Sequence, residues 1–110
     1  MSTVRRVGSA VRLRPEHRER YLELHASVWP GVEATLTACN LRNYTIWLLD
    51  DLLFAAFDYV GDDFDADMAR IAADPETQRW WQHTDPCQER LPGTPDGQQW
   101  LTLPEVWHLD

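Results

Sequence analysis

The chain has 110 residues, which is enough for a single domain (residues 1–110) with one modest core. Its formal net charge of −8 repels phosphate backbones and anionic membrane surfaces, so we expect neither nucleic acid nor a membrane as a partner. A hydrophobic content of 44%, with six tryptophans, excludes a disordered chain. The negative charge makes a neutral ligand the better fit.

The two cysteines, Cys39 and Cys87, show no CxxC spacing and too low a density for a disulfide scaffold. We therefore expect reduced thiols in a cytoplasmic protein. The longest apolar run, residues 52–57, is too short to span a membrane. No apolar stretch follows Arg5 and Arg6, so the sequence predicts no signal peptide.

Hydrophobic periodicity, prolines and turn residues divide the chain into alternating strands and helices. In chain order the predicted elements are a strand over 5–13, helices over 15–27 and 30–39, strands over 43–49 and 52–60, helices over 63–73 and 75–82, a loop over 85–99 and a last strand within 100–109. This order predicts an α+β protein of the ferredoxin-like βαββαβ type, with helices on one face of an antiparallel sheet.

Both faces of the predicted central hairpin are apolar. One register of the first strand offers Tyr44, Ile46 and Leu48, and the other offers Trp47 and Leu49. Helices can cover only one face, so a second copy of the chain or a lidded ligand pocket must cover the other. A homodimer is the simpler expectation, because two-fold pairing is the commonest assembly.

Tyr21, His25 and Trp29 recur every fourth residue before Pro30. On a helix this spacing forms one slowly drifting stripe. A phenol, an imidazole that can give or take a proton near neutrality, and a flat ring indicate a small-molecule site. A solvated or half-buried histidine with no role is the plainer alternative.

Trp80, Trp81 and Tyr44 are further candidates. Adjacent helical residues point about 100° apart, so one tryptophan can face the core while the other lines a cavity. An aromatic face packs on the C–H face of a sugar ring, and a phenol can donate to a ligand oxygen. Ordinary core packing of all three rings stays open at this point.

Metal binding is not expected, because the histidines are scattered and no HExxH-like spacing exists. Asp62, Asp63, Asp65 and Asp67 lack the glycine and terminal glutamate of a calcium loop, and predict a solvated helix start instead. The sequence also has no glycine-rich phosphate loop and no basic patch.

Four motifs in order, spread over nearly the whole chain, resemble those of the L-rhamnose mutarotase family. They are Tyr21-x-x-x-His25-x-x-x-Trp29-Pro30, Asn43-Tyr44, Gln78-Arg79-Trp80-Trp81 and Glu105-Val106. The resemblance is weaker over 62–75 and 85–99. Gly31, where the family often has an acidic residue, His83 and the stretch 85–87 depart from its pattern.

The resemblance implies a dimeric α+β barrel that interconverts the α and β anomers of a 6-deoxy sugar, L-rhamnose or L-fucose, without a cofactor. It implies His25 as the proton donor, and Tyr21, Tyr44, Trp80 and Trp81 as the sugar-binding set. The group that acts as the base stays open, with Tyr21 or a water as candidates. Two other functions stay open: another α+β barrel enzyme on a small substrate, and a sugar-binding module without activity.

Overall fold

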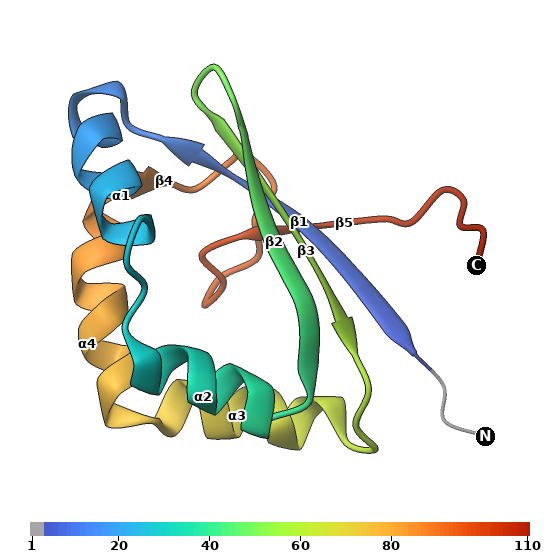
Figure 1. Cartoon of the computed structure of the whole chain (residues 1–110). Coiled ribbons are helices and arrows are strands. Elements are labelled where there is room, and N and C mark those ends of the chain that lie inside the picture. Colours follow the sequence, from blue (N-terminus) through green and yellow to red (C-terminus); the bar gives the residue numbers. More distant parts are fainter. Residues whose placement is uncertain (1–3) are drawn as a thin grey trace.

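The computed structural model describes residues 4–110. Its elements are β1 (Arg5–Leu13), the 3-10 turn η1 (Pro15–His17), α1 (Arg18–His25), α2 (Pro30–Ala38), β2 (Leu41–Leu49), β3 (Leu52–Tyr59), α3 (Phe64–Ala73), α4 (Pro75–Thr84), η2 (Asp85–Cys87), β4 (Gln88–Glu89) and β5 (Leu101–Leu103). The strands form one antiparallel sheet in the order β2-β3-β1-β4, with β5 also paired to β1. The helices lie on one side of this sheet (Figure 1). The predicted ferredoxin-like α+β fold is confirmed.

The last strand differs from the prediction. β4 and β5 both pair with β1, opposite residues 12–13 and 8–10 respectively, and the segment between them leaves the sheet. The predicted loop over 85–99 therefore contains η2 and β4, and the predicted strand within 100–109 is reduced to Leu101–Leu103. Residues 90–100 separate the two short strands, although only Val11 of β1 lies between their pairing positions, so this segment must loop out of the sheet.

The first helix is also shorter than predicted. It starts as the 3-10 turn η1 at Pro15 and ends at His25, not at residue 27. The helices predicted over 63–73 and 75–82 are confirmed as α3 and α4. Asp63 and Asp74 cap them by accepting the backbone N–H of Ala66 and Thr77, respectively.

The inner face of the sheet, which faces the helices, carries the core. Val11, Leu13 and Leu53 are almost fully buried there, together with Tyr21 and Cys87. A second buried cluster joins Cys39, Leu41, Tyr59 and Ile71 beneath α3. Both cysteines are buried and unpaired in these separate clusters, as the sequence predicts.

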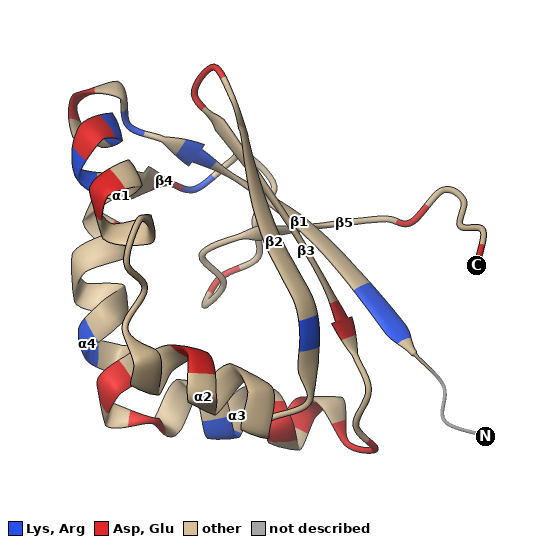
Figure 2. Ribbon diagram, in the orientation of Figure 1, with Lys and Arg blue, Asp and Glu red and all other residues tan. Residues whose placement is uncertain are grey.

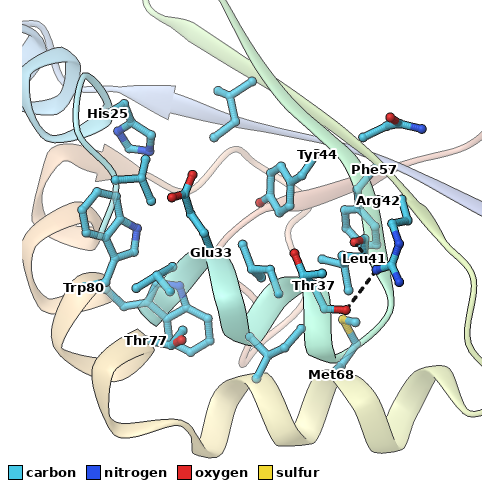
Figure 3. A pocket seen from close by; sticks show the side chains of 17 residues that line it. His25, Glu33, Thr37, Leu41, Arg42, Tyr44, Phe57, Met68, Thr77 and Trp80 are labelled. Atoms are coloured by element: carbon cyan, nitrogen blue, oxygen red, sulfur yellow. Dashed lines mark hydrogen bonds between the residues drawn. The ribbon is translucent and has the colours of Figure 1, made fainter. Parts of the chain in front are cut away.

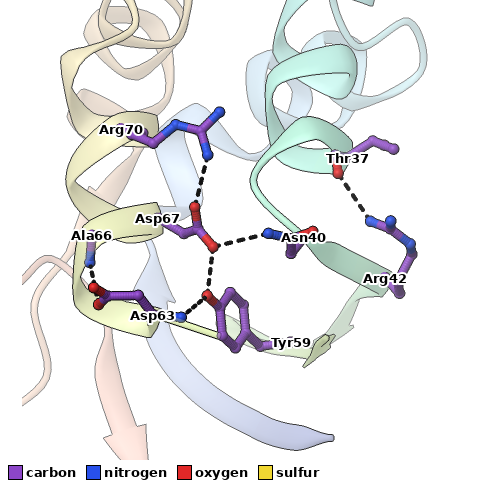
Figure 4. A network of polar contacts seen from close by, with 8 residues as sticks. All are labelled: Thr37, Asn40, Arg42, Tyr59, Asp63, Ala66, Asp67 and Arg70. Atoms are coloured by element: carbon purple, nitrogen blue, oxygen red, sulfur yellow. Dashed lines mark hydrogen bonds and ion pairs between the residues drawn. The ribbon is translucent and has the colours of Figure 1, made fainter. Parts of the chain in front are cut away.

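A polar network fastens the start of α3 to the end of β3 and to the α2–β2 connection (Figure 4). Its centre is Asp67, whose Oδ2 accepts hydrogen bonds from Tyr59 Oη at 2.5 Å and Asn40 Nδ2 at 3.0 Å. Its Oδ1 accepts a hydrogen bond from Arg70 at 2.8 Å. Asp67 is only 7% exposed, so the expectation of a fully solvated helix start was wrong at this residue. The aspartate holds the elements together instead of facing water.

The charges lie mainly on the helices, at the β2–β3 turn and at the ends of strands (Figure 2). The middle of β1, β2 and β3 carries none. Within residues 4–110, no helix is long and apolar enough to cross a membrane.

Candidate active site

Tyr21 and His25 lie one helical turn apart on α1 and face the space between the helices and the sheet. Their rings stack with centroids 4.2 Å apart. Tyr21 is 2% exposed, and its hydroxyl accepts a 3.5 Å hydrogen bond from Gln88 of β4. The predicted stripe is therefore confirmed for these two residues.

The hydrogen bond made by His25 fixes its tautomer. Its Nδ1 lies 3.0 Å from the Tyr21 carbonyl oxygen, which can only accept, so Nδ1 carries the proton. The second ring nitrogen, Nε2, is left for a ligand. Burial lowers the pKa of His25 from its ordinary value, and the bond to the Tyr21 carbonyl offsets part of that effect. The imidazolium that forms is therefore a stronger acid than that of a solvated histidine.

Trp80 and Trp81 differ in burial, and both line the cavity. Trp80 is 6% exposed and makes edge contacts with His25 and Trp29, each with ring centroids 5.3 Å apart. Trp81 points from the next position of α4 and stays 37% exposed at the cavity. Trp29 lies beyond the end of α1, where it caps α2 and packs behind Trp80. It supports the site and does not line it.

Tyr44 reaches the same cavity from β2 because of a β-bulge. The register with β3 shifts by one residue between Arg42 and Thr45, and Asn43 adopts a left-handed backbone with φ of 54°. Tyr44 then lies on the inner face, stacked on Phe57 with ring centroids 5.4 Å apart. Desolvation raises the pKa of the Tyr44 hydroxyl, as it does that of Tyr21.

These side chains surround a cavity of about 640 Å³ between α1, α2, α4 and the sheet, a volume typical of small-molecule sites (Figure 3). His25, Tyr44, Trp80 and Trp81 line it. Its remaining wall is largely apolar and includes Val32, Leu36, Phe57, Met68 and Ile71. A ligand with both hydroxyl groups and an apolar substituent fits such a wall.

A second hollow of about 740 Å³ adjoins the first and shares Tyr44, Phe57, Trp80 and Trp81 with it. Tyr21 lines this second hollow, with Asp85, Gln88, Arg90 and Trp100. The five predicted site residues therefore line two adjoining spaces: His25 lines the first, Tyr21 the second, and Tyr44, Trp80 and Trp81 line both.

Sequence reasoning missed Glu33, Gln88 and Trp100. Glu33 is the one acidic residue that lines the His25 cavity among residues 4–110. Nothing distinguishes a lone helical glutamate in the sequence, and Gln88 and Trp100 fall in or beside the predicted loop. Within the same residues, no group of three His, Cys, Asp or Glu side chains is placed to hold a metal ion.

The Glu76 carboxylate, from the first turn of α4, lies in the space that a Cβ at Gly31 would occupy. Because this carboxylate is the end of a flexible side chain, it can move aside, and the contact does not by itself require glycine at residue 31.

An aromatic cavity of this size, lined by a histidine and enclosed between helices and a sheet, is typical of an enzyme that acts on a small molecule. Residues 6–109 match the family model described as L-rhamnose mutarotase, and the chain belongs to that family. It is 31% identical over 104 residues to an L-rhamnose mutarotase of Listeria monocytogenes, covering 94% of this chain and 97% of that one. It is 35% identical over 86 residues to an L-fucose mutarotase of Xanthomonas campestris, covering 76% and 68%.

Two solved structures show the same fold. One is an L-rhamnose mutarotase from Formosa agariphila, with a TM-score of 0.73 and 22% identity over 96% of this chain and 99% of that one. The other is the tetracenomycin F2 cyclase from Streptomyces glaucescens, with a TM-score of 0.66 and 13% identity over the same shares. Enzymes with different names thus share this fold, and the family match distinguishes the chain from the second.

Proposed function

We propose that this chain interconverts the α and β anomers of L-rhamnose, with His25 as the acid that opens the ring. The observation that carries the proposal is the placement of His25. Its Nδ1 is held by the Tyr21 carbonyl at 3.0 Å, its Nε2 makes no hydrogen bond within residues 4–110, and the residue lines an aromatic cavity. This is the arrangement that a proton-transfer step on a small ligand requires.

Mutarotation opens a hemiacetal to the free aldehyde and closes it on the other face. An acid must protonate the ring oxygen while a base removes the proton of the anomeric hydroxyl. In the proposed step, protonated His25 donates from Nε2 to the ring oxygen, the bond between that oxygen and the anomeric carbon breaks, and the aldehyde forms. After rotation about the neighbouring carbon–carbon bond, the reverse transfers close the ring, so the enzyme needs no cofactor.

The four aromatic side chains provide the sugar-binding surface in this proposal. Trp81 presents a partly exposed ring for the C–H face of the sugar, and the hydroxyls of Tyr21 and Tyr44 can donate to its oxygens. Trp80, which is buried against His25, holds the imidazole in place.

A 6-deoxy sugar is favoured because part of the cavity wall is apolar and suits a methyl group. Leu36, Phe57 and Met68 lie together there. The relatives include proteins named for L-rhamnose and one named for L-fucose. L-rhamnose comes first because the family model and most of the relatives carry that name.

We also propose that the protein is a homodimer formed through the outer face of the sheet. Trp47, Phe54, Ala10 and Leu101 lie in one cross-strand row on that face, and no helix covers them. Trp47 and Leu49 are 55% and 61% exposed. The same apolar face of a second copy of the chain can cover these residues in a two-fold pair. The apolar tail after β5, with Val106 and Trp107 exposed, adds surface for the same partner.

Two buried, unpaired cysteines support a reducing compartment, so the single domain is proposed to act in the cytoplasm with a free monosaccharide as its substrate.

The test is NMR saturation transfer between the anomeric protons of L-rhamnose, with and without the protein. We expect exchange above the spontaneous rate, and a loss of about 10²- to 10⁴-fold in His25→Ala, because general acid catalysis contributes that much. An unchanged rate in His25→Ala would remove His25 from the mechanism. Exchange with L-fucose and not with L-rhamnose would make L-fucose the substrate. Binding without any exchange would favour a non-catalytic sugar-binding module.

A further inference from the structure

The proposed reaction needs two groups that move protons at the same time, and His25 supplies only one. Its Nδ1 proton is held by the Tyr21 carbonyl, so a single nitrogen, Nε2, faces the ligand. One nitrogen cannot protonate the ring oxygen and deprotonate the anomeric hydroxyl in the same step. A second group must therefore act on the anomeric hydroxyl.

The lining of the His25 cavity, among the residues that the structure describes, offers three other titratable side chains: Glu33, Arg42 and Tyr44. Arg42 is no base, because a guanidinium has no free lone pair, and its Nη1 already donates to the Thr37 and Leu41 carbonyls. Desolvation raises the pKa of the Tyr44 hydroxyl, so it stays a proton donor at neutral pH. The same holds for Tyr21 in the adjoining hollow.

Asp85 is the other acidic residue near the site. It lines the second hollow, beside Tyr21, and does not line the cavity of His25. Among residues 4–110, Glu33 is therefore the one carboxylate in the lining of the cavity that His25 shares.

Glu33 lines the same cavity as His25, and its side chain stays exposed to solvent. It lies in the first turn of α2, where its backbone N–H is held by the Trp29 carbonyl. Its carboxylate projects into the space between His25 and Tyr44 (Figure 3). No hydrogen bond or ion pair found within residues 4–110 engages its side chain, so a ligand can bind it without displacing a partner.

We propose that Glu33 is the base that accepts the proton of the anomeric hydroxyl while His25 protonates the ring oxygen. This inference rests on the proposed mutarotase function. The Glu33 carboxylate takes the O–H proton, the electron pair of that bond forms the carbonyl, and the bond from carbon to ring oxygen breaks as His25 gives up its proton. On closure, protonated Glu33 returns a proton to the carbonyl oxygen and neutral His25 takes the hydroxyl proton. Both groups recover their starting states.

Glu33→Gln tests this assignment, because the amide keeps the shape of the side chain and removes the base. We expect kcat to fall about 10²- to 10⁴-fold, the range of general base catalysis, with KM nearly unchanged. Glu23→Gln is the matched control, since Glu23 is an exposed glutamate on α1 that lines neither cavity. It should keep the wild-type rate.

Chemical rescue separates a base from a merely structural residue. Glu33→Ala should be slow, and added formate should restore part of its activity in proportion to formate concentration. A formate effect on the wild-type enzyme of the same size would contradict the assignment, as would a wild-type kcat in Glu33→Gln. A rise in KM alone would make Glu33 a binding residue and overturn its role as base. An inactive wild-type protein would instead refute the mutarotase function itself.

Discussion

Replacing Trp47 with glutamate should separate the proposed dimer into single chains. Trp47 lies in the middle of β2 on the outer face, with 55% of its surface exposed in the single chain. A tryptophan can bury about 250 Å², so about 140 Å² remains to be covered, which at about 25 cal/mol per Å² contributes about 3 kcal/mol per copy. Because the dimer contains two copies of Trp47, the substitution removes about 7 kcal/mol from the free energy of association. This corresponds to roughly a 10⁵-fold rise in the dissociation constant, before the cost of burying two charges is added.

Sedimentation velocity at micromolar concentration measures this directly. The wild type should sediment as a dimer and Trp47→Glu as a monomer, with far-UV circular dichroism showing that the variant is folded. Leu22→Glu is the control, because Leu22 is a 46% exposed apolar residue on α1, away from the outer face. A monomeric wild type, or a Trp47→Glu protein that remains a dimer, would refute the reasoning that the uncovered sheet face binds a second copy.

Two further predictions concern titrating groups. Hydrogen bonds from Tyr59 and Asn40 hold the pKa of Asp67 below its usual range, so its stabilising effect is present above a pH of about 4 and is lost as pH falls through the lowered value. Asp67→Asn should therefore have a lower melting temperature than the wild type at pH 7. Thermal melts at decreasing pH should show this difference in melting temperature becoming smaller, and a difference that stays constant would contradict the assignment. For His25, burial beside Tyr21 predicts a proton NMR titration midpoint below 6.5, and a midpoint at or above that value would show a solvated ring.

Much of the fold was predictable because the local signals agree with one another. Pro30 and Pro75 begin helices, the alternation over residues 5–13 forms a strand, and the Asp50-Asp51 turn closes a hairpin. The last strand was not predictable in the same way. Its two pieces are each very short, and they belong to the sheet because β1 offers a free edge, which is a property of the tertiary structure.

The candidate site also combines residues that the sequence could predict with residues that only the tertiary structure reveals. Tyr21, His25, Trp80 and Trp81 could be selected from spacing on helices, and the structure brings all four to the same hollow region. The helical stripe could not place Trp29, because α1 ends first and the chain turns before that residue. Glu33 could not be selected at all. It becomes a candidate only in the folded chain, where α2 brings its carboxylate to the cavity that His25 of α1 also lines.

The Asn43-Tyr44 pair shows how one local feature serves the site and the proposed interface together. Side chains alternate between faces in a regular strand, so with Leu41 on the inner face Tyr44 would point outward. Leu41 is buried in the core, and Tyr44, although 43% exposed, lies on the same inner face and lines the cavity, because the bulge adds one residue to β2. Asparagine tolerates the left-handed backbone that this bulge needs, and its side chain donates to Asp58 at 2.9 Å.

The same shift determines everything that follows on β2. Beyond the bulge, Ile46 and Leu48 point inward to the core, and Trp47 and Leu49 point outward. If the same residues paired regularly, with no bulge between Arg42 and Thr45, every one of these side chains would change faces, which would place Trp47 in the core and remove Tyr44 from the cavity. The residue before the tyrosine thus works through the backbone. It sets which face of the sheet meets the sugar in the proposed function and which face is left for the proposed second copy of the chain.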